Sequence, residues 1–332
     1  MKKIITVLLI VFIAGAASAG ESKVGTSGAQ FLKIGVGSRY NGMGEASSAV
    51  ANDIYATYWN PAGLAQVENW SVGFTNVNWF LDIDLNYFGF ARYFEDIGTF
   101  GVSATVLSMD EQEITTFEEE NGTGQTYTAA SYAVGLSYAR QLTAKFAFGA
   151  TFKYVGERID NENASTFAFD FGTMMHTGWR SLRFGMCISN MGPEMKFSGS
   201  DLDVSYDELL GTGANETIGA SVKTTEYELP MTFRFGVAYD VNTGAKSMLT
   251  LSGELKHPND FNQQGSVGAE WAWDETFFVR SGYKMGYDEE TLSFGAGLST
   301  NISNDTELLI DYSWQDFGRL DNTHRFSVGF SF

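Results

Sequence analysis

The stretch Phe146-Ala-Phe-Gly-Ala-Thr-Phe-Lys-Tyr154 alternates large apolar side chains with small or polar ones. A period of two residues is typical of a β-strand, whose successive side chains point to opposite faces. The large side chains share one face, and they are Phe146, Phe148, Phe152 and Tyr154. The other face holds small residues and Lys153. The stretch therefore predicts a strand with one aromatic face and one narrow face that carries a charge.

The same alternation recurs from Trp70 to Phe332, in about fourteen runs separated by Gly, Asn, Asp and Thr, and bacterial membrane barrels have an even number of strands. Short connections alternate with longer ones, so the two longest, 110–124 and 190–230, fall at the same end. Long extracellular loops and short periplasmic turns are typical of outer-membrane barrels. No segment approaches eighteen consecutive apolar residues, which excludes a helical membrane protein. We expect an all-β fold, a transmembrane antiparallel β-barrel.

Charged residues of these runs fall opposite the apolar face. A soluble β-sandwich also alternates, but it turns Lys, Glu and Thr outward, whereas the second face here is mostly Gly, Ala, Ser and Thr. An Arg or Lys on the lipid face costs roughly 2 to 4 kcal/mol at mid-membrane. We therefore predict an apolar exterior in lipid and a lumen charge network formed by Lys153, Asp170, Arg183, Arg234, Glu254, Glu270, Arg280, Lys284 and Asp311.

The N-terminus resembles a secretory signal. Lys2 and Lys3 precede the apolar run 4–14, and Ala17-Ser18-Ala19 is the small-residue pattern at which signal peptidase cleaves. We expect residues 1–19 to be removed and the mature chain to reach the outer membrane of a Gram-negative cell. The alternative is a single N-terminal anchor, but the apolar run is too short to span a bilayer.

The amino-acid composition excludes several classes of protein. The chain has 332 residues, 40 Asp and Glu against 21 Lys and Arg, and one Cys. An acidic chain lacks the basic face of a nucleic-acid binder, and a single Cys excludes a disulfide scaffold. Much of the negative charge lies in the two long loops, for example at Glu118-Glu119-Glu120. We expect lipid and not nucleic acid as the surrounding partner.

Residues 20–69 differ from the barrel region 70–332. They show little period-two pattern and are rich in Gly, Ala and Ser. Asn60 can cap a helix that begins at Pro61, followed by Ala62 and Gly63. Because small residues allow close backbone approach, we expect this segment to fold inside the barrel as a hatch whose gating turn is Asn60 to Gly63. A plain capped helix at the start of the fold is the alternative.

Three stretches carry a family resemblance: Gly25-Thr-Ser-Gly-Ala-Gln-Phe-Leu-Lys-Ile-Gly35, Gly42-Met-Gly-Glu-Ala46 with Asn52-Asp53, and Tyr58-Trp-Asn-Pro-Ala-Gly-Leu64. They resemble the N-terminal signature of the PorV/PorQ group within the FadL-like (OmpP1/FadL) barrels. The resemblance implies a fourteen-stranded barrel with an internal hatch, and Asn60, Pro61 and Ala62 match the Asn-Pro-Ala of that hatch.

The last strand resembles the insertion signal that the barrel-assembly machinery reads. Its residues are Phe326, Phe330 and Phe332. The resemblance, and not the periodicity, implies this role.

The resemblance also implies function. PorV and PorQ serve type IX secretion, in which PorV-type barrels receive exported cargo, so we expect an accessory of protein export that engages cargo proteins or the translocon. The alternative is FadL-like passive transport of hydrophobic small molecules such as long-chain fatty acids or aromatic compounds. A general diffusion porin is disfavoured because a hatch would obstruct flow.

Catalysis finds little support in the sequence. The three His residues lie on different predicted strands, and no nucleophile elbow or dinucleotide motif occurs in a suitable context. We expect no enzyme activity, no catalytic residue, no metal site and no cofactor.

Overall fold

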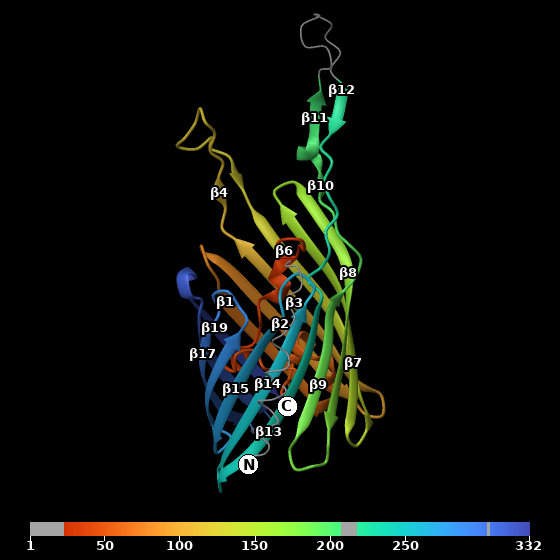
Figure 1. Ribbon diagram of the computed structural model, residues 1–332, viewed down its shortest axis with the longest axis vertical. Helices are drawn as coiled ribbons and strands as arrows, with labels where there is room; N and C mark the ends of the chain where they lie inside the picture. Colours follow the sequence, from red (N-terminus) through yellow and green to blue (C-terminus); the bar gives the residue numbers. More distant parts are fainter. Residues whose placement is uncertain (1–22, 207–217, 304–305) are drawn as a thin grey trace, which may run out of the picture.

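Fourteen antiparallel strands form a closed barrel in a computed structural model, which describes residues 23–206, 218–303 and 306–332 (Figure 1). Each strand pairs with its neighbours along the chain, and the first strand pairs with the last, with Phe74 opposite Val328. The predicted all-β transmembrane barrel is confirmed. The predicted signal peptide, residues 1–19, lies outside the described residues.

The barrel strands have the following bounds: β1 (Trp70–Asn78), β2 (Ile83–Phe94), β3 (Gly98–Met109), β6 (Ala129–Thr143), β7 (Phe146–Ile159), β8 (Glu162–His176), β9 (Arg183–Met191), β13 (Thr232–Gly244), β14 (Ser247–Pro258), β15 (Gln264–Trp273), β16 (Phe277–Met285), β17 (Leu292–Ser303), β18 (Thr306–Asp316) and β19 (Asn322–Ser331). Short strands lie in the long connections: β4 (Gln112–Glu113), β5 (Thr126–Tyr127), β10 (Ser198–Gly199), β11 (Asp203–Tyr206) and β12 (Ile218–Ser221).

The register places like faces side by side. Gly73 of β1 lies opposite Gly89 of β2 and Gly329 of β19, whereas Phe74 lies opposite Phe88. Because a one-residue slip would exchange the two faces, this pairing specifies the register strongly. The inner wall is thus built mostly from small and polar residues and the outer wall from large apolar ones.

The outer wall is an apolar belt. Leu136 is 58 % exposed and Phe326 is 55 % exposed, and large apolar side chains are exposed on strands around the whole barrel. A continuous apolar surface of this extent marks contact with a membrane. No helix among the described residues is long and apolar enough to cross a membrane.

One part of the outer wall is polar. Asn76 of β1 and Asn86 of β2 are partners in register, and the Nδ2 of Asn76 donates to Oδ1 of Asn86 at 3.1 Å. Both lie toward the end of the barrel that carries the β1–β2 turn. The amide pair satisfies one donor and one acceptor, which lowers the cost of placing two Asn residues on this face.

The N-terminal segment lies inside the barrel (Figure 1, red). Its elements are η1 (Gln30–Lys33), α2 (Ser38–Gly42), α3 (Ala56–Trp59) and η2 (Pro61–Gln66). Trp59, Tyr40 and Leu64 are fully buried. We call the described residues 23–69 the hatch, and its side chains form the core of the molecule together with the inner wall.

Two hairpins project from one end of the barrel, β4–β5 and β11–β12 (Figure 1). They belong to the two longest connections. Residues 95–97, 144–145 and 274–276 are short turns at the opposite end, where β19 also ends. We refer to the end with hairpins as extracellular and the other as periplasmic, following the usual asymmetry of such barrels.

The variant Leu136→Arg tests whether the apolar belt faces lipid. Leu136 lies in the middle of β6, so an Arg there should destabilise the folded barrel by roughly 2 to 4 kcal/mol. The matched control is Leu142→Arg, since Leu142 has the same exposure, 57 %, but lies one residue from the end of β6. There the cost should be about 0 to 1 kcal/mol. Urea unfolding in lipid vesicles measures both, and equal losses would contradict a lipid-facing belt.

Candidate functional site: the hatch and its contacts with the barrel

The turn at Asn60 joins the hatch to the barrel wall. The Oδ1 of Asn60 accepts from the backbone N–H of Ala62 at 3.2 Å and so caps η2, which begins at Pro61. Its Nδ2 donates to the carbonyl of Ser48 at 2.6 Å and to that of Thr173 on β8 at 3.1 Å. Asn60 therefore ties two hatch segments and one strand together while fully buried. Its gating role remains a prediction.

Glycines of the inner wall make room for this turn. A Cβ on Gly149 would lie 2.3 Å from the backbone of Pro61, and one on Gly172 would lie 2.1 Å from Oδ1 of Asn60. Gly63 has the same constraint inside the hatch, since its Cβ would lie 2.1 Å from the carbonyl oxygen of Ala51. A Cβ would likewise lie within 2.5 Å of the hatch backbone or of a hatch side chain at Gly73, Gly185, Gly236, Gly268 and Gly282. The bore is thus matched to the bare backbone of the hatch.

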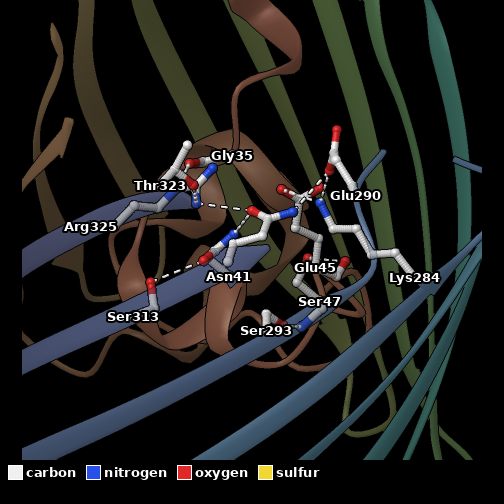
Figure 2. Close-up of polar contacts among 12 residues, drawn as sticks. Gly35, Asn41, Glu45, Ser47, Lys284, Glu290, Ser293, Ser313, Thr323 and Arg325 are labelled. Atoms are coloured by element: carbon white, nitrogen blue, oxygen red, sulfur yellow. Dashed lines mark hydrogen bonds and ion pairs between the residues drawn. The ribbon is translucent and has the colours of Figure 1, made fainter. Parts of the chain in front are cut away.

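A polar cluster docks α2 against β18 and β19 (Figure 2). Asn41 donates to Oε1 of Gln315 at 2.6 Å and accepts from the hydroxyl of Ser313 at 3.0 Å. Arg325 donates to the same Gln315 oxygen at 2.9 Å and to the carbonyl of Gly35 at 3.2 Å. Arg325 is 1 % exposed, and the groups that accept its hydrogen bonds, on Gly35, Gln315 and Thr323, are neutral.

An ion pair continues this cluster (Figure 2). The Nζ of Lys284 on β16 lies 2.9 Å from Oε1 of Glu45 in the hatch, and it also pairs with Glu290. Burial alone would raise the pKa of Glu45, but the nearby cations Lys284, Lys256 and Arg325 lower it to about 2. Glu45 therefore stays ionised at neutral and mildly acidic pH, and the contact does not depend on protonation there.

A second ionic chain runs from α2 across three strands. Arg39 donates to both carboxylate oxygens of Glu270, at 2.9 Å each, and Glu270 also accepts from Nε of Arg280 at 2.6 Å. Arg280 in turn pairs with Asp311 at 2.5 Å. All except Arg39 are nearly fully buried. Alternating signs let each charge face an opposite one, which such burial requires.

The remaining charged residues form separate pairs in the lumen. Lys153 pairs with Asp170 at 2.9 Å, and Arg183 pairs with Asp240 at 2.5 Å. Arg183 also donates to the hatch carbonyl of Ala49 at 2.9 Å.

Arg234 lies 3.4 Å from Glu254, whose Oε2 accepts from the backbone N–H groups of Ser47 and Ser48. The nine charged residues named from sequence thus lie in several local groups, and most of these groups include a hatch residue.

One side of the lumen is apolar. Phe31 and Leu32 of the hatch pack in a cluster that includes Tyr87 and Val155 of the wall. Met195 and Leu229, from the connection between β9 and β13, belong to the same cluster. A cavity of about 20 Å³ lies beside it, lined in part by Phe31, Leu32 and Tyr87. This is room for about one water molecule.

The aromatic residues of the last strand face outward or lie at its end. Phe326 is exposed, Phe330 is half-buried, and the ring of Phe332 stacks on Trp70 with centroids 3.6 Å apart. This stack joins the ends of β1 and β19. A role of these residues in insertion stays a prediction.

Sequence reasoning missed most hatch partners. Arg39, Asn41 and Glu45 lie in a segment without periodicity, and the family motif Gly42 to Ala46, which includes Glu45, assigned it no contact. Arg325 could have been found, because it occupies an inward position of the last strand between Thr323 and Ser327.

No group of three or more His, Cys, Asp or Glu could hold a metal ion within residues 23–206, 218–303 and 306–332. The only Cys, Cys187, is buried on the inner wall.

The variant Asn60→Asp tests whether the hydrogen bonds of Asn60 hold the hatch in place. The change removes the donors to Ser48 and Thr173 and places a charge beside two carbonyls. Leaving buried groups unpaired costs about 1 to 3 kcal/mol each, so hatch amides should exchange with solvent at least about tenfold faster. Hydrogen exchange with mass spectrometry measures this.

Asn52→Asp is the control, because Asn52 is exposed and its oxygen accepts from Arg39, an interaction that Asp keeps. If both variants exchange like the unmodified protein, Asn60 does not hold the hatch.

Solved transporter structures share this fold. The Pseudomonas putida toluene transporter TodX is 12 % identical, with a TM-score of 0.60, and the match covers 90 % of this chain and 98 % of that chain. A Pseudomonas aeruginosa FadL homologue is 12 % identical with a TM-score of 0.54, again over 90 % and 98 %. The Ralstonia pickettii toluene transporter TbuX is 13 % identical with a TM-score of 0.55, over 89 % and 97 %. At such identities the likeness concerns the fold.

No curated protein sequence matches the chain. A family model does match, over residues 17–216, and its description is type IX secretion system protein PorV. The match covers both hatch and barrel strands, and it places the chain among outer-membrane barrels and not among enzymes. The chain belongs to the PorV family of type IX secretion system proteins.

Proposed function

We propose that the protein is an accessory of type IX protein export that engages an exported protein or the translocon at the extracellular end of the barrel. The family match over residues 17–216 carries this proposal. Outer-membrane lipid surrounds the apolar belt, and the barrel-assembly machinery would insert the chain through its last strand.

The filled lumen supports a role in binding over a role in free diffusion. The hatch fills the bore and is tied to strands from β8 through β19 by the contacts described above. Opening it would break several buried ion pairs together, each costly to separate. A general porin is therefore a poor description of this barrel.

The extracellular hairpins support a role in binding proteins. Phe117, at the end of the β4–β5 hairpin, is 97 % exposed, and Glu118, Glu119 and Glu120 beside it are exposed as well. An aromatic side chain that projects into water next to a charged rim is typical of a protein-binding anchor. A partner with an apolar pocket and a basic rim would complement it.

The alternative is passage of hydrophobic small molecules, which the apolar side of the lumen favours. Phe31, Leu32 and Tyr87 would line such a path. However, the connection between β9 and β13 covers this side with Met195 and Leu229, and the cavity has room for about one water. Transport would need both the hatch and this connection to move.

Deletion of the gene tests the proposal against the alternative. If the protein serves export, secreted proteins should accumulate in the periplasm and disappear from the medium and the cell surface, as quantitative mass spectrometry of the three fractions would measure. Growth on or uptake of a labelled fatty acid or toluene should be unchanged. Normal secretion with lost uptake would favour solute transport instead.

Phe117→Ser tests the hairpin within the export role. Loss of an interface anchor costs about 2 kcal/mol or more, so binding of the partner should weaken about thirtyfold and secretion should fall. Tyr93→Ser at the periplasmic end of β2 is the control, because Tyr93 is also an exposed aromatic residue, 40 % exposed. Folding of both variants is checked by hydrogen exchange of the strands. Equal secretion by the two variants would remove the hairpin from the binding surface.

A further inference from the structure

A cavity of about 500 Å³ opens at the periplasmic end of the barrel, between the hatch and the ends of β1, β17, β18 and β19. Its lining includes Arg39, Asp53 and Glu68 of the hatch and Glu307 of β18. Trp70 and Phe332, whose rings stack, stand at its rim. The volume lies in the range of ligand pockets, roughly 300 to 1,000 Å³. We call this cavity the periplasmic vestibule.

The vestibule has an excess of negative charge. Its Arg39 is already paired with Glu270, and its Asp311 is paired with Arg280. In the described part of the chain, Asp53, Glu68 and Glu307 have no Lys or Arg partner. Three carboxylates without an ion-pair partner thus line the same cavity, and Arg39 offsets part of the charge of Asp53.

Two of the three carboxylates, Asp53 and Glu307, are held in place by hydrogen bonds, whereas Glu68 is exposed. Glu307 accepts from the hydroxyls of Ser299 and Ser331, the latter at 3.1 Å, and Asp53 accepts from the backbone N–H of Tyr55 at 2.9 Å. Asp53 and Glu307 are both half-buried. Walls of low dielectric around like charges concentrate their field and attract an opposite charge.

The residues that line the vestibule favour a Lys or Arg side chain over a metal ion as the bound cation. A metal ion is disfavoured, because the described carboxylates are not arranged to hold one. Apolar lining from Ile54, Val67 and Leu309 lies beside the carboxylates. A Lys or Arg side chain combines an aliphatic stem with a charged head and suits such a surface. The stacked rings at the rim add an aromatic face for the same head group.

We propose that the periplasmic vestibule binds a basic, extended segment of a periplasmic protein, with Lys or Arg side chains held by Asp53, Glu68 and Glu307. The site lies at the opposite end from the extracellular hairpins. It does not depend on the export role, because its geometry and charge are those of the barrel itself.

Peptide binding tests this with the full-length protein in nanodiscs, where both ends are accessible. The probes are fluorescein-labelled peptides with alternating Lys-Ala and Glu-Ala sequences, followed by fluorescence anisotropy. The Lys-Ala peptide should bind and the Glu-Ala peptide should not. In Asp53→Asn/Glu68→Gln/Glu307→Gln, binding should weaken at least about tenfold, since each charge-assisted contact contributes more than a neutral one.

A matched control separates the vestibule from the general negative charge of the protein. Asp82→Asn/Asp288→Asn/Asp321→Asn removes the same charge from exposed positions in extracellular turns outside the two hairpins, and binding should change less than about twofold because exposed charges so distant are screened. Equal losses in the two triple variants, or no loss in the vestibule variant, would overturn the proposal. Competition by spermidine as strong as by the unlabelled Lys-Ala peptide would also overturn it, because a small cation would then suffice.

A second variant tests the shape without changing a charge. Gly329 lines the vestibule, and a Cβ there would meet its nearest neighbours at 3.7 and 3.8 Å, an ordinary contact distance. Gly329→Leu should therefore fold and fill part of the space, and peptide affinity should fall at least about tenfold through steric exclusion. Unchanged affinity in a folded Gly329→Leu protein would place the peptide elsewhere.

Discussion

The pairing of every backbone polar group across the barrel wall is the constraint on which the rest of the structure depends. In hydrocarbon an unpaired N–H or C=O costs several kcal/mol, so the wall must close, and here β1 closes on β19. Closure with fourteen strands sets the width of the bore. The hatch has to fit a space whose size it does not determine. This explains why Gly149 and Gly172 face the Asn60 turn, since any side chain at those positions would overlap with atoms of Asn60 or Pro61.

The hatch is held by polar contacts at least as much as by apolar packing. Burial of Arg280 and Arg325 is costly, and replacing buried ion pairs with apolar side chains is often neutral or stabilising. Stability alone therefore does not explain the pairs of Arg39 with Glu270 and of Glu45 with Lys284. Polar partners demand one geometry, whereas an apolar plug could slide or rotate in the bore. We interpret the pairs as fixing the position of the hatch.

The wall could be predicted from sequence and the hatch contacts could not. In Phe146–Tyr154 one physical rule, apolar to lipid and small or polar to lumen, applies to every residue, so period two reveals both strand and orientation. The lumen position of Arg234 or Lys284 follows from the same rule. Arg39 and Glu45 follow no such rule, because their places depend on turns at Gly37 and Gly44, whose positive φ angles redirect the chain. Pairings between hatch and wall, hundreds of residues apart, leave no local pattern.

The two ends of the barrel differ in how they carry negative charge. At the extracellular end Glu118, Glu119 and Glu120 stand on a hairpin in water, where salt screens them and they act mainly on the rate of encounter with a partner. At the periplasmic end Asp53 and Glu307 line a concave wall, where screening is weaker and an incoming cation is held at short range. Arg39 and Asp311 belong both to this wall and to the ionic chain that holds α2. A cation bound by Asp53 and Glu307 would share the cavity with Arg39 and Asp311, so its charge would act on the ionic chain that holds α2.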